Sequence, residues 1–261
     1  MIRNLIYGTW RGVWDNNLNK ETNINKESCF KLLETAYASG IRIYDTSEFY
    51  GNGYAETILG TYSANNWPRE SYQIISKIQG DRSPDQIEYY LRKSLERLNV
   101  EYLDCYMLHW FTEYTDVKSI LHTFLDLKEK GYIRKIGICN CTYKQLRYCY
   151  QILANQLDSV QLEYNFVQRN NGKIPFVQDI ILPFCHQKGI DFLAYNPFAP
   201  ILAQKPEEII KLSDKYNKSS CQLAIKWLLY QKVKVLIGTS NVEHLVQDVD
   251  INFDISEWKP L

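Results

Sequence analysis

Short apolar segments alternate with amphipathic helical segments along the whole 261-residue chain, and this alternation restricts the fold more than any other feature. Strands are expected at residues 2–9, 41–44, 72–77, 103–108, 135–139, 160–164, 190–195 and 233–237. Helices are expected at residues 25–39, 55–64, 83–98, 116–130, 177–188, 207–216 and 219–230, and two more begin at Thr142 and Asn241. Strands that alternate with helices are typical of a parallel sheet covered by helices.

Eight strand–helix units predict an α/β protein, a compact (β/α)8 TIM barrel formed by residues 1–261 as a single domain. Such a barrel takes roughly 250 residues. A doubly wound sheet is the alternative, but its nucleotide-binding form carries G-x-G-x-x-G after an early strand, and this sequence has no such motif. No low-complexity tract or linker rich in Pro, Gly or Ser divides the chain.

Several helix starts carry recognisable capping residues. Asn25 is a plausible N-cap, and Ser83 with Gln86 has the spacing of a capping box, with a proline in the first turn. Thr142 opens another helix, and Asn241 precedes the last one.

The overall composition argues against several classes of partner. Lys plus Arg and Asp plus Glu both number 30, so no basic face is expected, and nucleic acid and anionic membranes are excluded as partners. Seven cysteines without a regular framework, and no signal peptide, indicate a reducing cytoplasm. No apolar run is long enough to span a bilayer, and the cysteine and histidine spacings do not supply four ligands for zinc, so no metal is expected.

The stretch 40–51, G-I-R-I-Y-D-T-S-E-F-Y-G, contains the first candidate site residues. It places Asp45 at a strand end and Tyr50 in the loop beyond, while Lys77 and His109 end two later strands. Taken alone, Asp45 could cap a helix and Tyr50 could belong to the core. In a barrel the carboxyl ends of all strands face one rim, so these four side chains are expected to converge.

Together the four groups make a chemically coherent set. A phenol has a pKa of about 10 and is a weak acid at neutral pH. A neighbouring ammonium group lowers that pKa, and a carboxylate keeps the ammonium charged and in place. With an imidazole to orient a carbonyl oxygen, the set can protonate that oxygen as a hydride reaches the carbon.

The sequence resembles the aldo-keto reductase family across nearly its whole length. The motifs that carry the resemblance are D-T-S-E-x-Y-G at 45–51, S-K at 76–77, L-H-W at 108–110, I-G-I-C-N at 136–140, Q-L-E-Y-N at 161–165, A-Y-N-P at 194–197 and I-G-T-S-N-x-E-H-L at 237–245. The resemblance implies a (β/α)8 barrel in which Tyr50 is the general acid/base, Asp45 and Lys77 tune it, and His109 orients the carbonyl.

The resemblance also implies a nicotinamide cofactor, NADPH with NADH possible. Asn140 and Gln161 would bind the carboxamide, Tyr195 would stack on the ring, and Gly238, Thr239 and Ser240 would bind the adenosine-side phosphate. The full expected cofactor set is Thr9, Trp10, Asp45, Cys139, Asn140, Gln161, Tyr195, Asn196, Pro197, Gly238, Thr239, Ser240, His244 and Asp248. The alternative for Asn140, Gln161 and Tyr195 is a structural role as a turn residue, a polar strand end and a core aromatic.

Four features depart from the family pattern. Cys139 replaces a serine, the N-terminal hairpin is apparently lacking, and the segment 198–206 and the C-terminal loops are short. His244 stands where an arginine often reads the 2′-phosphate of NADPH, and Gln247 and Asp248 replace the usual residues at adenine.

The expected activity is NAD(P)H-dependent reduction of an aldehyde or ketone to an alcohol. Two alternatives stay open: a nucleotide-binding sensor or regulatory subunit with little turnover, and a dehydratase or isomerase on the same barrel. The expected partner is a small carbonyl compound, and a monomer is favoured by analogy. Expected substrate contacts, which could equally be packing residues where aromatic, are Trp10, Trp14, Phe49, Tyr50, His109 and Trp110.

Overall fold

A closed barrel of eight parallel strands, arranged in chain order, confirms the TIM barrel expected from the sequence. The computed structural model describes residues 1–12, 26–170 and 172–255. The barrel closes where β1 pairs with β8, with Leu5 opposite Val235 and Tyr7 opposite Ile237. The strands are β1 Leu5–Gly8, β2 Ile43–Asp45, β3 Gln73–Ile78, β4 Cys105–Leu108, β5 Ile136–Cys139, β6 Ser159–Glu163, β7 Asp191–Tyr195 and β8 Lys234–Ile237.

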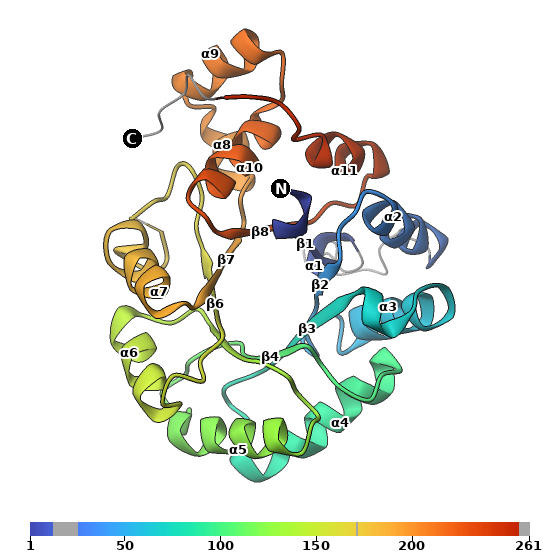
Figure 1. The fold of residues 1–261 in the computed structure, drawn as a ribbon, viewed down its shortest axis with the longest axis vertical. Helices are drawn as coiled ribbons and strands as arrows, with labels where there is room; N and C mark the ends of the chain where they lie inside the picture. Colours follow the sequence, from blue (N-terminus) through green and yellow to red (C-terminus); the bar gives the residue numbers. More distant parts are fainter. Residues whose placement is uncertain (13–25, 171, 256–261) are drawn as a thin grey trace.

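Helices surround this ring of strands (Figure 1). The α-helices are α1 Thr9–Gly12, α2 Lys26–Ala38, α3 Tyr54–Asn66, α4 Ile87–Leu98, α5 Val117–Glu129, α6 Tyr143–Ile152, α7 Leu182–Lys188, α8 Ala199–Gln204, α9 Glu207–Tyr216, α10 Ser220–Tyr230 and α11 Val242–Val249. The 3-10 turns are η1 Ile2–Asn4, η3 Arg69–Ser71 and η4 Pro84–Gln86, and η5 Val177–Ile181 is a π-helical turn.

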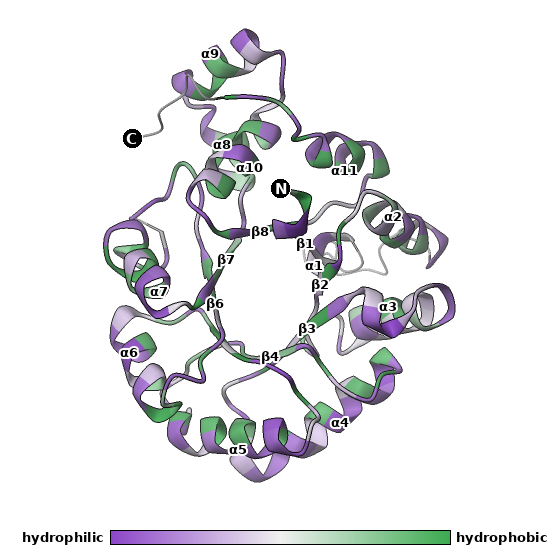
Figure 2. Ribbon diagram, viewed as in Figure 1, coloured by the Kyte–Doolittle hydropathy of each residue, from purple (hydrophilic) through white to green (hydrophobic). Residues whose placement is uncertain are grey.

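Two apolar layers hold the fold together. One lies between the strands and the helices, and hydrophobic segments alternate with hydrophilic ones along the outer helices such as α5 (Figure 2). The other fills the barrel itself, as in other TIM barrels, and consists of Ile6, Ile43, Ile75, Cys105, Met107, Cys139, Leu193 and Leu236.

The register of the parallel strands brings the polar strand ends to one rim. Asp45, the last residue of β2, pairs with Ile75 of β3, and Lys77 of β3 pairs with Met107 of β4. Because all strands run the same way, the residues that follow them gather at a single end of the barrel, where TIM-barrel enzymes carry their active sites.

Two local expectations were wrong, and a third segment, which was expected only to be short, contains a helix. The first strand begins at Leu5, because Ile2–Asn4 forms a 3-10 turn. The side chain of Ser83 makes no capping bond, since the chain enters the tighter turn η4 before α4 begins and the amide of Gln86 bonds to the backbone carbonyl of Ser83. The short segment after β7 is not a plain loop but contains α8.

Other helix starts follow the sequence signals. Thr142 and Gln145 form a reciprocal capping box at α6, and the Asn241 side chain accepts the amide N–H groups of Glu243 and His244 at α11. The predicted cap at Asn25 lies outside the described residues.

Candidate active site

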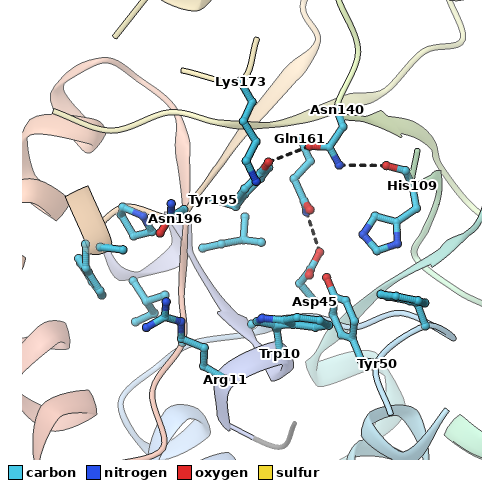
Figure 3. A pocket seen from close by; sticks show the side chains of 18 of the residues that line it. Trp10, Arg11, Asp45, Tyr50, His109, Asn140, Gln161, Lys173, Tyr195 and Asn196 are labelled. Atoms are coloured by element: carbon cyan, nitrogen blue, oxygen red, sulfur yellow. Dashed lines mark hydrogen bonds between the residues drawn. The ribbon is translucent and has the colours of Figure 1, made fainter. Parts of the chain in front are cut away.

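A cavity of about 380 Å³ opens at the C-terminal end of the barrel, above the strand ends. Figure 3 shows its polar side chains pointing toward a common centre from several strands and loops. Its lining residues are Gly8, Trp10, Arg11, Asp45, Phe49, Tyr50, His109, Trp110, Asn140, Gln161, Lys173, Tyr195, Asn196, Pro197, Phe198, Ala199, Leu236, Ile237 and Gly238.

A buried lysine links the carboxylate and the phenol at the base of this cavity. Lys77 is 0% exposed and donates to Asp45 Oδ1 at 2.6 Å, to the Thr46 carbonyl oxygen at 2.8 Å and to the Tyr50 hydroxyl at 3.3 Å. These three acceptors match the three N–H groups of an ammonium ion, which fixes the direction of the side chain. The arrangement places the Tyr50 hydroxyl at the cavity with a cation directly behind it.

The proton affinities in this group are set by burial and by the charge pair together. Burial raises the pKa of Tyr50 to about 12, and the positive charge of Lys77 lowers it only in part. The expected lowering by lysine is therefore present but smaller than the effect of burial. Burial alone would lower the pKa of Lys77, but its interactions with the Asp45 carboxylate, Tyr50 and Cys139 together outweigh burial, so the pKa of Lys77 is raised and the ammonium stays charged.

His109 lies beside the phenol as a neutral imidazole. Burial, and then the charge of Lys77, lowers the pKa of His109 well below its usual value. Its Nδ1 lies 3.2 Å from the Ser47 hydroxyl oxygen. When that hydroxyl donates to Nδ1, the ring proton is on Nε2, which is then the nitrogen free to donate a hydrogen bond.

Asp45 also orients an amide that faces the cavity. Gln161 Nε2 donates to Asp45 Oδ2 at 2.7 Å, and a carboxylate can only accept, so the Gln161 oxygen must point the other way. Both oxygens of the buried Asp45 are therefore engaged, one by Lys77 and one by Gln161.

Asn140 forms a second oriented amide in the loop after β5. It adopts φ of 52°, a left-handed conformation that asparagine tolerates better than most residues. Its Nδ2 donates to the His109 carbonyl oxygen at 3.0 Å, and its Oδ1 accepts from the Tyr195 hydroxyl at 2.8 Å. These bonds tie the loops after β4 and β5 to the end of β7.

Aromatic rings form the wall on the side of the phenol. Trp10 lies 4.7 Å from Tyr50 in an edge-on arrangement and stacks with Phe49 at 6.3 Å between ring centroids. Trp110 stacks on His109 at 4.9 Å. Phe49 and Trp110 are 43% and 39% exposed, so much of both rings is free to contact a ligand rather than the core.

The structure brings most of the predicted residues to this cavity and leaves six predicted cofactor residues off its lining. Thr9 and Cys139 are buried behind the lining, and Asp248 is 5% exposed within α11. Thr239, Ser240 and His244 lie beyond Gly238, which lines the cavity. These six contacts stay predictions, and Trp14 lies outside the described residues.

Two basic residues of the lining, Arg11 and Lys173, were missed from the sequence. Arg11 follows the predicted Trp10 directly, so its position was a usable signal. Lys173 lies in the long segment between β6 and η5, where no periodic pattern indicates its direction.

The described part of the chain offers neither a metal site nor a membrane span. No three side chains of the His, Cys, Asp and Glu types come together there in a way that could hold a metal ion. No helix within residues 1–12, 26–170 and 172–255 has the length and apolar character needed to cross a bilayer.

Comparison with known proteins agrees with this geometry. The sequence profile of the aldo/keto reductase family matches residues 4–260. An NADH-specific methylglyoxal reductase of Escherichia coli is 25% identical, with 96% of this chain and 90% of that protein covered. A thermostable aldo-keto reductase solved with the inhibitor epalrestat superimposes with a TM-score of 0.81 at 25% identity, covering 97% of this chain and 91% of that one.

A further structure shows the same fold at lower identity. An aldo/keto reductase from Klebsiella pneumoniae, solved with NADP and acetate, has a TM-score of 0.80 at 20% identity and covers 96% of this chain and 87% of that one. These matches place the barrel among the NAD(P)H-dependent oxidoreductases. The match over nearly the full length shows that the chain belongs to the aldo/keto reductase family.

Proposed function

We propose that this protein reduces an aldehyde or ketone to an alcohol, with Tyr50 as the proton donor. The observation that carries this proposal is the Tyr50 hydroxyl facing the cavity with Lys77 3.3 Å behind it. A donor in hydrogen-bond reach of a bound carbonyl oxygen is the first requirement for general acid catalysis.

The cavity is suited to a nicotinamide nucleotide, which supplies the hydride when it is bound. The Gln161 nitrogen is held by Asp45 and its oxygen lies 3.9 Å from the Cys139 thiol, so this oxygen is the atom of the oriented amide that would accept from a carboxamide NH2 group. Asn140 keeps a second N–H on its amide nitrogen for the carboxamide oxygen, and Tyr195 offers a ring for stacking. A side chain at Gly238 would have its Cβ 2.9 Å from the Gly8 carbonyl oxygen, so glycine keeps this edge of the cavity open.

Each residue near the carbonyl has a distinct part in the proton transfer. His109 is neutral, and in the tautomer with its proton on Nε2 it would donate a hydrogen bond to the carbonyl oxygen and orient it toward Tyr50. Tyr50 then gives its proton to that oxygen, and Lys77 stabilises the phenolate that remains. Asp45 keeps Lys77 charged through the 2.6 Å ion pair.

NADPH is the proposed cofactor, with NADH usable. The related proteins include an NADP complex and an NADH-specific reductase. Thr239, Ser240 and His244 are the proposed contacts of the adenosine-side phosphates, with Asp248 near the adenine. The proposed substrates are small carbonyl compounds that fit against Trp10, Phe49 and Trp110. A monomeric state and a cytoplasmic location remain predictions from the sequence.

The experiment that tests this proposal follows the loss of absorbance of NADPH and of NADH at 340 nm with a panel of aldehydes and ketones. Turnover with at least one carbonyl compound supports the reductase. Nucleotide binding without turnover across the panel would favour the sensor alternative, and carbonyl-independent chemistry would favour a dehydratase or isomerase.

A further inference from the structure

The catalytic cavity contains an unneutralised positive charge on the loop between β6 and η5. Lys173 lines the cavity, and Figure 3 shows its side chain extending from that loop into the cavity toward Tyr195. Among the residues that the structure describes, it makes no hydrogen bond or ion pair. Lys173 is exposed to solvent at the cavity, so its unpaired ammonium group is accessible to an anionic ligand.

The loop that carries Lys173 is fastened on both sides of it. The Phe176 amide donates to the Asn170 carbonyl oxygen at 3.1 Å, which closes the loop at its base. The Asn170 side chain accepts from the Gln178 amide at 3.0 Å and donates to Asp179 at 2.7 Å. These bonds hold Asn170 and Phe176, which flank the segment that carries Lys173.

No acid lining the cavity is free to neutralise this lysine. Asp45 is the only Asp or Glu among the lining residues that the structure describes, and both of its oxygens are already engaged by Lys77 and Gln161. His109 is neutral, because its pKa is lowered by burial and by Lys77. An anionic ligand would therefore meet an unpaired cation here rather than compete with a protein carboxylate.

The ligand class follows from which part of the cavity Lys173 serves. The nucleotide's phosphates are proposed to lie along Gly238, whose ideal Cβ position is 3.9 Å from Arg11 Cβ, so Arg11 is the cation suited to that end. Lys173 instead extends toward Tyr195, which bonds to Asn140, where the uncharged carboxamide end is proposed to bind. Because neither the phosphates nor the carboxamide would place a negative charge at Lys173, the substrate is the ligand that could do so.

We propose that Lys173 forms a subsite for an anionic group of the substrate, so that the enzyme prefers small carbonyl compounds bearing a carboxylate. This inference rests on the proposed reductase function. The carbonyl would lie between Tyr50 and His109, the body of the substrate against the aromatic wall, and the carboxylate at Lys173.

The test uses pairs of substrates that differ in charge: 4-carboxybenzaldehyde with 4-methylbenzaldehyde, and succinic semialdehyde with butanal. kcat and KM are measured for the wild type, Lys173→Met, Lys173→Arg and Lys144→Met. Lys144 is an exposed lysine of α6 that does not line the cavity, so its variant removes the same charge from elsewhere on the surface.

In the wild type, the carboxylated member of each pair is expected to have a kcat/KM about five- to tenfold higher, chiefly through KM. Lys173→Met should abolish that preference and leave the neutral substrates within about twofold. Lys173→Arg should keep the preference, Lys144→Met should not change it, and 0.5 M salt should reduce it in the wild type.

Three results would overturn the subsite: no charge preference in the wild type, equal losses for both members of a pair in Lys173→Met, or a matching loss of NADPH affinity in that variant. The last would assign Lys173 to a cofactor phosphate. If no aldehyde is reduced at all, the proposed function fails separately. The subsite is then tested by tryptophan fluorescence with 4-carboxybenzyl alcohol, and equal affinity in the wild type and Lys173→Met would refute it.

Discussion

Asp45 and Asp248 are both predicted site residues and are buried to nearly the same degree, but they differ in their hydrogen-bond and ion-pair partners. Asp45 is 2% exposed and bonds to Lys77 at 2.6 Å and to Gln161 at 2.7 Å. Asp248, in α11, is 5% exposed and has no hydrogen-bond or ion-pair partner among the described residues. Burial raises the pKa of Asp248 to about 7.

The two regions therefore differ in how completely their polar groups are paired: those around Asp45 are paired, whereas the carboxyl group of Asp248 in α11 is not. Around Asp45 the charge is paired and each donor and acceptor has a fixed direction before any ligand binds, as preorganised electrostatic catalysis requires. Around α11, His244 is exposed and the buried carboxyl of Asp248 is unpaired. Catalysis requires side chains whose positions are fixed before the substrate binds. At α11, by contrast, the proposed adenosine end of the nucleotide would itself supply hydrogen-bond partners when it binds.

The largest effect is expected from Lys77→Met, which removes the ion pair between Lys77 and Asp45. The phenolate loses its neighbouring cation, so kcat should fall on the order of 10²–10³-fold. The pKa of Tyr50 should rise further, because Lys77 is the group that lowers it, and the rise of alcohol oxidation with pH should move to higher pH. Steady-state pH profiles in the oxidation direction check this, and a profile of unchanged position would limit Lys77 to a structural role.

The same variant leaves Asp45 buried without its cation, which should lower the free energy of unfolding by about 3–5 kcal/mol. The double variant Lys77→Met with Asp45→Asn removes both charges and serves as the matched control. It should recover most of the stability in denaturant titrations without recovering the rate. Recovery of the rate as well would mean that the charge pair supports folding only.

In α11, the substitution Asp248→Asn should stabilise the protein at alkaline pH. The pKa of about 7 in the folded state lies above the unfolded value of ~3.9, so the folded state holds the extra proton. The contribution of protonated Asp248 to the free energy of unfolding is therefore fully present below about pH 4 and is lost as pH rises through about 7. The variant should be more stable by about 1–3 kcal/mol at pH 8 and nearly equal to the wild type at pH 4, measured by urea unfolding.

The opposite result for Asp248→Asn would remove the difference between the two buried carboxylates. If Asp248→Asn were less stable at pH 8, the carboxylate would have a stabilising partner in solution, and the two buried acids would be alike. Addition of NADPH gives a further readout, because a contact between Asp248 and adenine would make the variant's nucleotide affinity differ from that of the wild type.

The smallest expected effect is on nucleotide choice at His244. A histidine lacks the bidentate fork of donors by which an arginine binds a phosphate, so the wild type should prefer NADPH over NADH only modestly. His244→Arg should increase the preference by about tenfold, for one added charge-assisted contact of ~1.5 kcal/mol. Dissociation constants from fluorescence quenching test this, and a strong NADPH preference in the wild type would mean that another cation binds the 2′-phosphate.

The sequence was sufficient for the barrel and for the four residues at its base. Asp45, Lys77 and His109 end or follow buried strands, and the parallel register that any such barrel requires brings them together. Their polar side chains stand out because strand interiors are otherwise apolar. Gln161 and Asn140 were predicted instead from the family motifs that contain them.

The remaining features depend on packing that no local pattern encodes. Lys173 reaches the cavity only because the loop around it closes through Asn170. The burial of Asp248 depends on how α11 packs against the preceding helix α10 and against α2, which is far from it in sequence. The effect of burial on Tyr50 exceeded that of Lys77 because the depth of the site, unlike its charges, is absent from the sequence.

The central claim is that Tyr50 supplies the proton, and the variant Tyr50→Phe tests it most directly. Its kcat for carbonyl reduction and its Kd for NADPH should be measured together, with circular dichroism to confirm folding. Loss of the hydroxyl should lower kcat at least about 100-fold while the Kd stays within about threefold, because the hydroxyl acts on the substrate oxygen. A variant that keeps most of its kcat would contradict the account.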